Sequence, residues 1–448
     1  MKALKIGIAG VRGIVGETLT PELVIAFTQA FATYLDCGKV LICRDTRSSG
    51  PMVQAAVASG LLASGCEVID LGICPTPTMQ LAVEHFKAAG GISITAGHNP
   101  AQWNALKFVR GDGLYLNTRQ AEELLDVFHQ GEFTKARWNE IHPQIETRDA
   151  IAHHIEALKQ AFDVEAIRAR KLIVAVDCCN GACALLSPRW LEELGCRVLA
   201  INDETELPFP HNPEPKRETM AQLRAVVKAG QADIGFAHDA DGERIGIVTE
   251  TGEALSEEMT LAIAAEIKLG QKPGVIVTHL STSRTIEAIA ARHNSTVVRT
   301  PVGQAYISEA MLEHKAVLGG EGNGAVAIPE IHATNDAAAT IGLILEHLAK
   351  SGKPISEIAA SLPRYTMLKH YVSVAPNLLF SVLNEIRAEA ETAGADEIDL
   401  NDGIKLSWPD GWLHIRASNT ESMIRLIAEA QSEVRANDLL DWAVDRLK

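Results

Sequence analysis

The sequence predicts an α/β protein made of several consecutive domains, and three observations support this class. The chain has 448 residues, more than the ~100–200 of a typical domain, which indicates three or four domains. Short β-branched segments alternate with alanine-rich helical segments along most of the chain, a pattern typical of sheets covered by helices. The last part instead carries two short strands around a turn and then a helix, which predicts a smaller α+β domain.

The first strand–helix alternation fills the N-terminal part of the chain. Its apolar runs are four to seven residues long and rich in Val, Ile and Leu, whereas the helical segments are longer and rich in alanine. In chain order we expect a strand at 5–9, a helix at 21–35, a strand at 40–44, a helix at 51–64, and strands at 67–71 and 91–95.

The alternation restarts twice before the pattern changes. KLIVAVDCCNGA, from residue 171, reads as a buried strand, a loop and the start of a helix, and PGVIVTHLSTSRTIEAIAA, from residue 273, repeats this order. Antiparallel strands at 403–407 and 412–416 then flank the turn Pro409-Asp410-Gly411, and a helix follows at 432–446. Polar or Gly/Pro-containing stretches divide the chain into predicted domains I to IV, at 1–150, 151–252, 253–368 and 369–448.

Composition narrows the classes of partner. The chain has 57 acidic and 41 basic residues, a formal net charge of −16, which disfavours general binding to nucleic acid or to an anionic membrane. The first residues, MKALKIGIAGVRG, lack the apolar core of a signal peptide. No apolar run approaches the ~20 residues of a membrane span. We therefore expect a cytoplasmic protein. Cys178, Cys179 and Cys183 lack the paired spacing of a zinc site, so we expect buried thiols. The sequence does not indicate an oligomeric state.

Four polar loops, one in each predicted domain, carry the residues suited to chemistry. The first is Thr95-Ala96-Gly97-His98-Asn99-Pro100, followed by Lys107. It comes directly after a strand, where α/β proteins place ligands, and its small residues let a phosphate approach the backbone. Lys107 adds a charge or a titratable amine. Taken alone, the loop also fits a strand end capped by His98.

The second loop is His238-Asp239-Ala240-Asp241-Gly242-Glu243-Arg244, again directly after an apolar strand. Its carboxylates at i, i+2 and i+4 can converge on one cation, and hard oxygen ligands favour Mg²⁺. Without a cation the three charges would repel one another. A solvated acidic turn is the alternative, although it does not explain the preceding buried strand or the final arginine.

The third and fourth loops suit a sugar and a phosphate. Glu321 and Asn323, in the glycine-rich run Gly319–Gly324, can hydrogen-bond sugar hydroxyls, although a glycine turn alone is weak evidence. The fourth loop offers guanidinium, hydroxyl and amide groups for a phosphate, and a helix N-cap is its alternative role. The residues of this predicted phosphate clamp are Arg416, Ser418, Asn419, Thr420 and Arg425.

In this order and spacing the loops resemble the α-D-phosphohexomutase superfamily, whose members interconvert hexose 1-phosphates and 6-phosphates. The resemblance covers essentially the whole chain and implies three related α/β domains with mixed sheets and a smaller C-terminal α+β domain around a central cleft. The further motifs that carry it are Gly10-Val11-Arg12-Gly13, Arg44-Asp45-Thr46-Arg47, Pro75-Thr76-Pro77-Thr78, Pro213-Glu214-Pro215 and Thr300-Pro301-Val302-Gly303.

The resemblance also implies roles for individual residues. Arg12 would hold the catalytic phosphoryl group, Lys107 would act as general acid or base, and Arg244 would neutralise the transferring phosphoryl group. Glu321 and Asn323 would contact sugar hydroxyls, and the clamp would hold the other phosphate. Asp239, Asp241 and Glu243 would bind Mg²⁺, with Glu243 where the family usually has aspartate. A hexose 1,6-bisphosphate activator is also implied.

The main departure from the family is Gly97. The family motif has serine before the histidine, and that serine carries the phosphate that moves to and from the substrate. Glycine has no nucleophile. Thr95 and Ser93 are the nearest hydroxyls, and His98 is an alternative acceptor. A hydroxyl two residues back lies too far away for in-line transfer unless the loop rearranges, because a strand rises ~3.3 Å per residue.

Three functional readings follow. The first is a mutase with an unusual nucleophile or phosphoryl source. The second is another Mg²⁺-dependent phosphosugar enzyme, such as a phosphatase, and the third is a non-catalytic phosphosugar-binding protein. We favour the mutase, because a binding protein would not need the metal ligands, Lys107 and Arg12.

Overall fold

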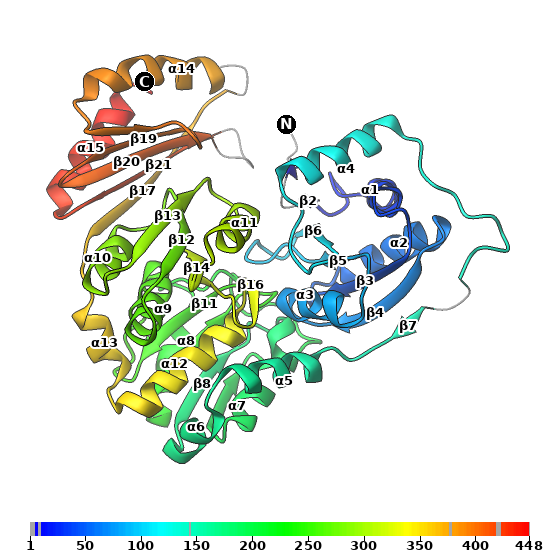
Figure 1. The fold of residues 1–448 in the computed structure, drawn as a ribbon, viewed down its shortest axis with the longest axis horizontal. Helices are drawn as coiled ribbons and strands as arrows, with labels where there is room; N and C mark the ends of the chain where they lie inside the picture. The colour runs from blue at the N-terminus through cyan, green and yellow to red at the C-terminus, as the bar shows by residue number, and fades with distance from the viewer. Residues whose placement is uncertain (1–4, 8–9, 143–144, 376–378, 418–422, 448) are drawn as a thin grey trace.

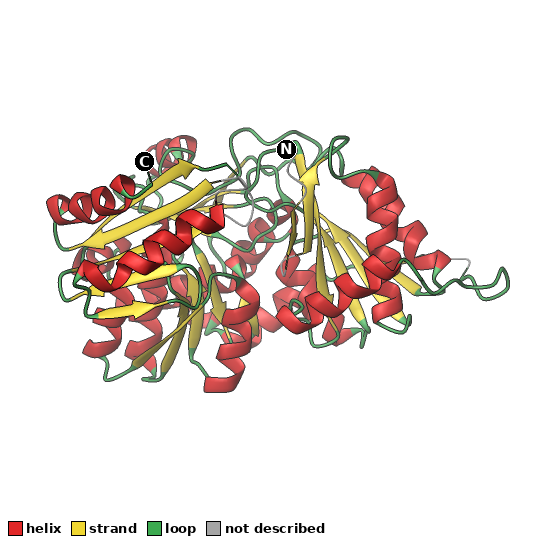
Figure 2. Cartoon of the chain, turned by 90° about the horizontal axis from the view of Figure 1, so that it is seen from above, coloured by secondary structure: helices red, strands yellow, loops and turns green. Residues whose placement is uncertain are grey.

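The computed structural model describes residues 5–7, 10–142, 145–375, 379–417 and 423–447. It contains four β-sheets that follow one another along the chain, with helices packed on them (Figures 1 and 2). The predicted class, three α/β domains with mixed sheets and a last α+β domain, is confirmed. No helix within the described ranges is long and apolar enough to cross a membrane.

The first sheet has seven strands in the order β1-β2-β6-β5-β3-β4-β7. The strands β3, β4 and β5 run parallel because helices connect them, whereas β6 runs antiparallel between β5 and β2. The strands are β1 (Lys5–Gly7), β2 (Gly10–Ile14), β3 (Lys39–Arg44), β4 (Glu67–Ile73), β5 (Gly90–Ile94), β6 (Trp103–Arg110) and β7 (Glu146–Thr147), and the helices are α1 (Pro21–Tyr34), α2 (Gly50–Ala63), α3 (Thr76–His85) and α4 (Thr118–Gln130).

The second and third sheets repeat the strand–helix alternation, in the orders β11-β10-β8-β9 and β13-β12-β14-β15-β16. The elements of the second domain are α5 (Ile151–Ala161), α6 (Val164–Arg170), β8 (Ile173–Asp177), α7 (Ser187–Glu193), β9 (Arg197–Ile201), α8 (Ala221–Gly230), β10 (Ile234–His238) and β11 (Ile245–Thr249). The elements of the third domain are α9 (Glu257–Gln271), β12 (Val275–His279), α10 (Thr285–Arg292), β13 (Thr296–Thr300), α11 (Gln304–His314), β14 (Leu318–Glu321), β15 (Ala325–Ile328), β16 (His332–Asn335), α12 (Ala337–Ser351) and α13 (Ile355–Ser361).

The fourth sheet is antiparallel throughout, in the order β17-β21-β20-β19-β18. The predicted hairpin around Pro409-Asp410-Gly411 is present as β19 and β20. The predicted domain boundary at 368 falls inside β17, which carries the chain from the third unit into the fourth. The elements are β17 (Thr366–Ser373), α14 (Leu379–Ala390), β18 (Glu397–Asp399), β19 (Ile404–Trp408), β20 (Gly411–Ala417), β21 (Met423–Ala430) and α15 (Glu433–Asp445).

Buried polar contacts join the first three units. The Nδ1 of His154 lies 2.8 Å from the Thr78 hydroxyl, and its Nε2 lies 2.8 Å from Asp336 Oδ2. Asp336 also caps α12, because its Oδ1 accepts hydrogen bonds from the N–H groups of Ala338 and Ala339. These side chains are fully or almost fully buried. They therefore fix the relative positions of the domains that carry the first three loops.

The cysteines form no disulfide bond. All eight are free thiols, and six of them are buried, including Cys178, Cys179 and Cys183.

Candidate functional site

The four polar loops meet in one cleft of about 420 Å³. Its lining includes residues from every predicted loop, although these loops are far apart in the sequence. The residues concerned are His98, Arg244, Glu321, Asn323, Arg416 and Arg425.

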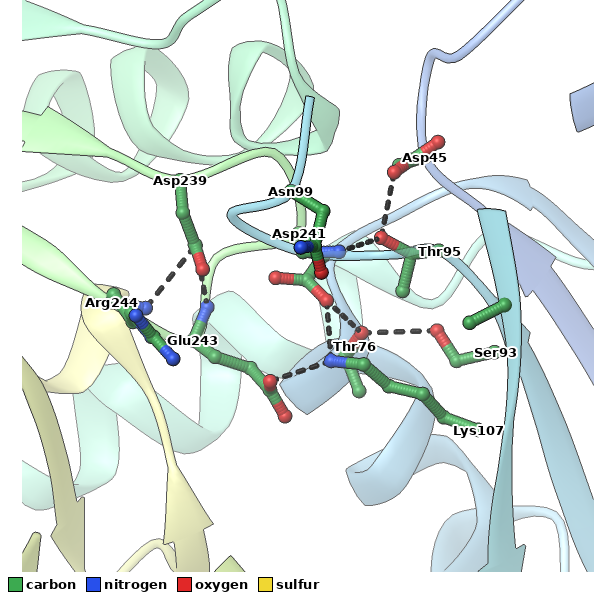
Figure 3. Close-up of polar contacts among 12 residues, drawn as sticks. Asp45, Thr76, Ser93, Thr95, Asn99, Lys107, Asp239, Asp241, Glu243 and Arg244 are labelled. Atoms are coloured by element: carbon green, nitrogen blue, oxygen red, sulfur yellow. Dashed lines mark hydrogen bonds and ion pairs between the residues drawn. The ribbon is translucent and has the colours of Figure 1, made fainter. Parts of the chain in front are cut away.

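Lys107 makes one of the contacts between domains I and II (Figure 3). It lies in the middle of β6, paired with Ser93 of β5, so the sheet fixes its backbone. Its Nζ lies 2.6 Å from Asp241 Oδ2 and 2.6 Å from Glu243 Oε2. The Tyr115 hydroxyl donates a hydrogen bond to the other Glu243 oxygen. One ammonium group therefore occupies the space between two carboxylates of the predicted metal loop.

This arrangement keeps Lys107 charged. Burial opposes the charge, but the carboxylates of Asp241 and Glu243 outweigh it and raise the pKa of Lys107 above its ordinary value. Burial likewise opposes ionisation of Asp241, yet Lys107 holds the pKa of that carboxyl below its usual range. An ammonium with a raised pKa can give up a proton during a reaction and can stabilise negative charge. It is not poised to accept a proton, so the acid role implied for Lys107 suits this geometry better than the base role.

The loop that carries these carboxylates is held by the domains on both sides. The Thr76 N–H of domain I donates to the Asp241 carbonyl at 2.9 Å, and the Ala337 N–H of domain III donates to the Gly242 carbonyl at 3.0 Å. Within the loop, Asp239 Oδ1 accepts hydrogen bonds from the N–H groups of Glu243 and Arg244 at 3.1 and 3.2 Å. The loop conformation is thus fixed by backbone hydrogen bonds.

The three predicted metal ligands are not gathered around one point. Within the described ranges, no group of three or more His, Cys, Asp and Glu side chains is placed to hold a metal ion. Both Glu243 oxygens are engaged by Lys107 and Tyr115. Asp241 Oδ1, in contrast, is buried and has no hydrogen-bond partner among the described residues. Burial, followed by the charge of Asp241, also raises the pKa of Asp239 well above its usual value. The unpartnered oxygen of Asp241 is therefore the one that suits a cation, and the three-ligand set stays a prediction.

Arg47 holds the loop around Gly97 through hydrogen bonds to the carbonyl groups of the loop. The Nη2 of Arg47 donates to the carbonyls of Gly97 and Asn99 at 2.7 and 2.8 Å, and its Nη1 donates to Pro100 O at 2.7 Å. The Nε of Arg47 pairs with Asp45 Oδ2 at 2.9 Å. These contacts, made by a buried arginine, leave the loop little conformational freedom.

Gly97 has a left-handed backbone, with φ +54°. A Cβ built there would lie 3.4 Å from both carboxylate oxygens of Asp241, which is ordinary contact. A side chain at position 97 would therefore point at the acidic loop, with room for its first atom. Glycine suits the backbone angle, because other residues pay for a positive φ.

The predicted phosphate-binding arginines of domains I and II line the cleft close to this loop. Arg12 Nη1 donates to Asn99 Oδ1 at 2.6 Å. Burial, followed by the charge of Arg244, lowers the pKa of Arg12 from its ordinary value. Arg244 Nη1 lies 3.5 Å from Glu214 Oε1. Two guanidinium groups near enough to repel each other form an attractive position for a phosphoryl dianion.

The predicted sugar loop lies on the domain III side. The Nδ2 of Asn323 donates to Glu321 Oε2, so the two predicted sugar ligands contact each other. A side chain on Gly322 would collide with the carboxylate of Glu258. The Glu258 carboxylate therefore lies directly against the backbone of that turn.

The predicted phosphate clamp is described only in part. Arg416 donates from Nε and Nη2 to Asp402 Oδ1 at 3.3 and 3.2 Å. The Nε of Arg425 is buried and has no hydrogen-bond partner among the described residues. Both arginines line the cleft. The other predicted clamp residues, Ser418, Asn419 and Thr420, lie outside the described residues.

Sequence reasoning missed several residues that line the cleft or shape the site. Tyr115 was not singled out, and no local pattern marks it, since its partner Glu243 lies 128 residues away. Glu258 and Lys369 line the cleft from domains III and IV. Asn212, Glu214 and Lys216 also line it, and the motif Pro213-Glu214-Pro215 was the available signal.

Comparison with known proteins agrees with this architecture. The chain matches the family described as phosphoglucomutase/phosphomannomutase in all four of its domains. The alpha/beta/alpha domains I, II and III match residues 3–135, 152–252 and 256–365, and the C-terminal domain matches residues 374–445.

Individual relatives are similar over nearly their whole length. A "Phosphoglucomutase/phosphomannomutase" of Thermococcus kodakarensis is 39% identical, covering 99% of this chain and 98% of that protein. A "Phosphoglucosamine/phosphogalactosamine mutase" of Sulfurisphaera tokodaii is 32% identical, covering 97% of each. The crystal structure of a putative phosphomannomutase from Thermus thermophilus is 26% identical with a TM-score of 0.84, covering 100% of both chains. The chain therefore belongs to the phosphoglucomutase/phosphomannomutase family of the α-D-phosphohexomutase superfamily.

Proposed function

We propose that this protein is a phosphohexomutase that interconverts the 1-phosphate and 6-phosphate of a hexose or hexosamine. The observation that carries the proposal is the distribution of charge in the cleft. Arg12 and Arg244 line it from domains I and II, and Arg416 and Arg425 line it from domain IV. Glu321 and Asn323 supply the polar groups for a sugar. The cleft thus has one pair of arginines on each side. Two such pairs suit a sugar that carries a phosphate first at one end and then at the other.

The chain's own residues support a division of roles. Arg12 and Arg244 would orient the phosphoryl group that moves, and the charged Lys107 would give a proton to the departing sugar oxygen. Arg416 would leave Asp402 for the phosphate that stays in place. The buried, unpartnered Nε of Arg425 supports the same role, because an unsatisfied buried donor is costly until a ligand accepts from it.

We further propose that Mg²⁺ takes part, held by Asp239 and Asp241. The buried Asp241 Oδ1 supports this, since this acceptor has no hydrogen-bond partner among the described residues. When bound, the ion would stabilise charge on the transferring phosphoryl group. Glu243 would join it only by leaving Lys107. The complex of an Aspergillus fumigatus N-acetylphosphoglucosamine mutase with GlcNAc-6P and magnesium shows such an ion in a protein of this fold.

Gly97 favours a second candidate, hydrolysis of the sugar phosphate, because the hydroxyl that would accept the phosphoryl group is absent. ³¹P NMR of the purified protein with Mg²⁺ and several hexose 1-phosphates separates the two, with and without glucose 1,6-bisphosphate. Growth of a 6-phosphate resonance supports the mutase, whereas release of inorganic phosphate alone supports the phosphatase. If no resonance changes with any sugar, only a binding role is left. We expect the reaction to take place in the cytoplasm.

A further inference from the structure

A mutase needs a group that accepts the phosphoryl group, and the hydroxyls near Gly97 are already engaged. The Thr95 hydroxyl donates to Asp45 Oδ2 at 2.6 Å and accepts from the Gly97 N–H at 2.9 Å. The Ser93 hydroxyl lies 3.0 Å from that of Thr76. Thr95 and Ser93 are almost completely buried, and neither lines the cleft. Each would have to break a hydrogen bond and move before it could attack phosphorus.

Two histidines line the cleft, and their ring nitrogens differ. The Nδ1 of His279 accepts from the Ser281 N–H at 3.1 Å, so its lone pair is occupied and its proton lies on Nε2. For His98, no hydrogen bond joins either ring nitrogen to another residue in the described part of the chain. Of these two imidazoles, only that of His98 has a free lone pair facing the cleft.

The backbone on both sides of His98 is fixed. The carbonyls of Gly97 and Asn99 both accept from Arg47 Nη2, which is locked by Asp45. The imidazole is half-buried beside them. A nucleophile on a rigid loop reaches phosphorus without an ordering cost, which is a condition for efficient in-line transfer.

The charge around His98 suits both the free ring and a phosphorylated one. Burial, and then the charges of Arg244, Arg12, Lys107 and Lys216, hold the pKa of His98 well below its usual range. The ring is therefore neutral at physiological pH and keeps its lone pair. The same four cations would stabilise a phosphoryl group placed on that nitrogen.

We propose that His98 is the phosphoryl acceptor of this enzyme, in place of the family's serine. This inference rests on the proposed mutase function. The lone pair of one ring nitrogen forms a P–N bond as the P–O bond of a hexose 1,6-bisphosphate breaks, and the departing sugar oxygen takes a proton from solvent water. In the return step a hydroxyl of the reoriented or exchanged sugar monophosphate attacks phosphorus, its proton passes to solvent water, and the P–N bond breaks.

The test is the chemical stability of the phosphoprotein. Wild-type protein is incubated with glucose 1,6-bisphosphate and Mg²⁺, quenched in alkali and analysed by mass spectrometry. We expect one phosphoryl group on the peptide containing His98, stable in alkali and lost in mild acid, as phosphoramidates are. An acid-stable, alkali-labile phosphate on any serine or threonine would overturn the inference.

His98→Gln and His129→Gln form a matched pair, because His129 is an exposed histidine far along α4. We expect His98→Gln to lose the label and at least ~1000-fold of mutase turnover, while glucose 1-phosphate still binds within ~threefold of wild type. His129→Gln should keep both label and turnover. Normal turnover by His98→Gln, or by an unlabelled wild type, would overturn the role of His98 and leave the mutase function standing. An acid-labile label on His98 without any sugar isomerisation would support this acceptor and reject the mutase function.

Discussion

The Nζ of Lys107 lies 2.6 Å from Asp241 Oδ2, so a cation of domain I pairs with a predicted metal ligand of domain II. Ammonium and metal ion would compete for the same carboxylate. The pairing also means that the acidic loop is partly neutralised before any metal or substrate binds.

Magnesium affinity tests this competition. We expect weak Mg²⁺ binding by the wild type without substrate, and at least ~10-fold tighter binding by Lys107→Met, since removal of the ammonium leaves Asp241 and Glu243 free for the ion. Isothermal titration calorimetry measures both. Lys159→Met, which removes a partly exposed lysine paired with Glu156, is the control and should bind like wild type. Tight binding by the wild type would contradict the account.

The phosphate clamp can be tested through Arg416. Arg416→Ala should weaken binding of a sugar phosphate by ~1.5–3 kcal/mol, the usual contribution of a hydrogen bond to a charged group. Arg435→Ala removes a guanidinium that pairs with Asp410 at the surface of the same domain and should change affinity little. Calorimetric titration with glucose 1-phosphate gives both values. Equal affinities would place the phosphate elsewhere.

The contact between domains III and IV should be acid-sensitive because of His414. This ring is fully buried, with Nε2 2.6 Å from the Asp402 carbonyl and Nδ1 2.8 Å from the Ser281 hydroxyl. Burial lowers its pKa to about 4. The unfolded chain, with a histidine pKa of ~6.5, therefore binds the extra proton first as pH falls. Stability is full above pH ~6.5 and is lost by up to about 3 kcal/mol as pH falls to ~4.

Urea unfolding between pH 8 and pH 4 measures this loss. His414→Gln keeps a side-chain donor and acceptor but cannot titrate, so its stability should depend less on pH over that window. His129→Gln should retain the wild-type slope. If His414→Gln and wild type have the same slope, the buried ring does not carry the effect.

Substitution of Gly97 should cost stability through the backbone. Because φ is +54° and a Cβ there makes only ordinary contacts, both Gly97→Ser and Gly97→Ala should lose ~1 kcal/mol in urea unfolding. Gly97→Ser should also take up an acid-stable phosphate from glucose 1,6-bisphosphate, which Gly97→Ala cannot. A serine that stays unphosphorylated in an active enzyme would show that its oxygen does not reach the substrate.

Local patterns in the sequence were enough for the strands that precede the first, second and fourth loops, because an apolar run followed by polar residues marks a strand end. No strand was predicted before the third loop, where the structure has β14. Local patterns were also not enough for β6. The segment holding Lys107 was treated as the continuation of a loop, since it pairs on one side with β2, which is distant in sequence, and on the other with β5 across the polar first loop.

Several of the predicted site residues line the cleft, but their pairings with one another were not predicted. Asp241 and Glu243 were expected to face a metal ion, whereas Lys107 lies between them. A contact across 134 or 136 residues depends on how two domains pack, and no spacing rule encodes it. The same reason explains why Tyr115 was missed.

The central claim is that a chain with glycine at position 97 still isomerises sugar phosphates. The most direct measurement is a ³¹P NMR time course of wild-type protein with Mg²⁺, a catalytic amount of glucose 1,6-bisphosphate, and glucose, mannose or glucosamine 1-phosphate. The account predicts that at least one 1-phosphate resonance decays while the matching 6-phosphate resonance grows in equal amount, without inorganic phosphate. Unchanged spectra for all three sugars, or phosphate release alone, would contradict it.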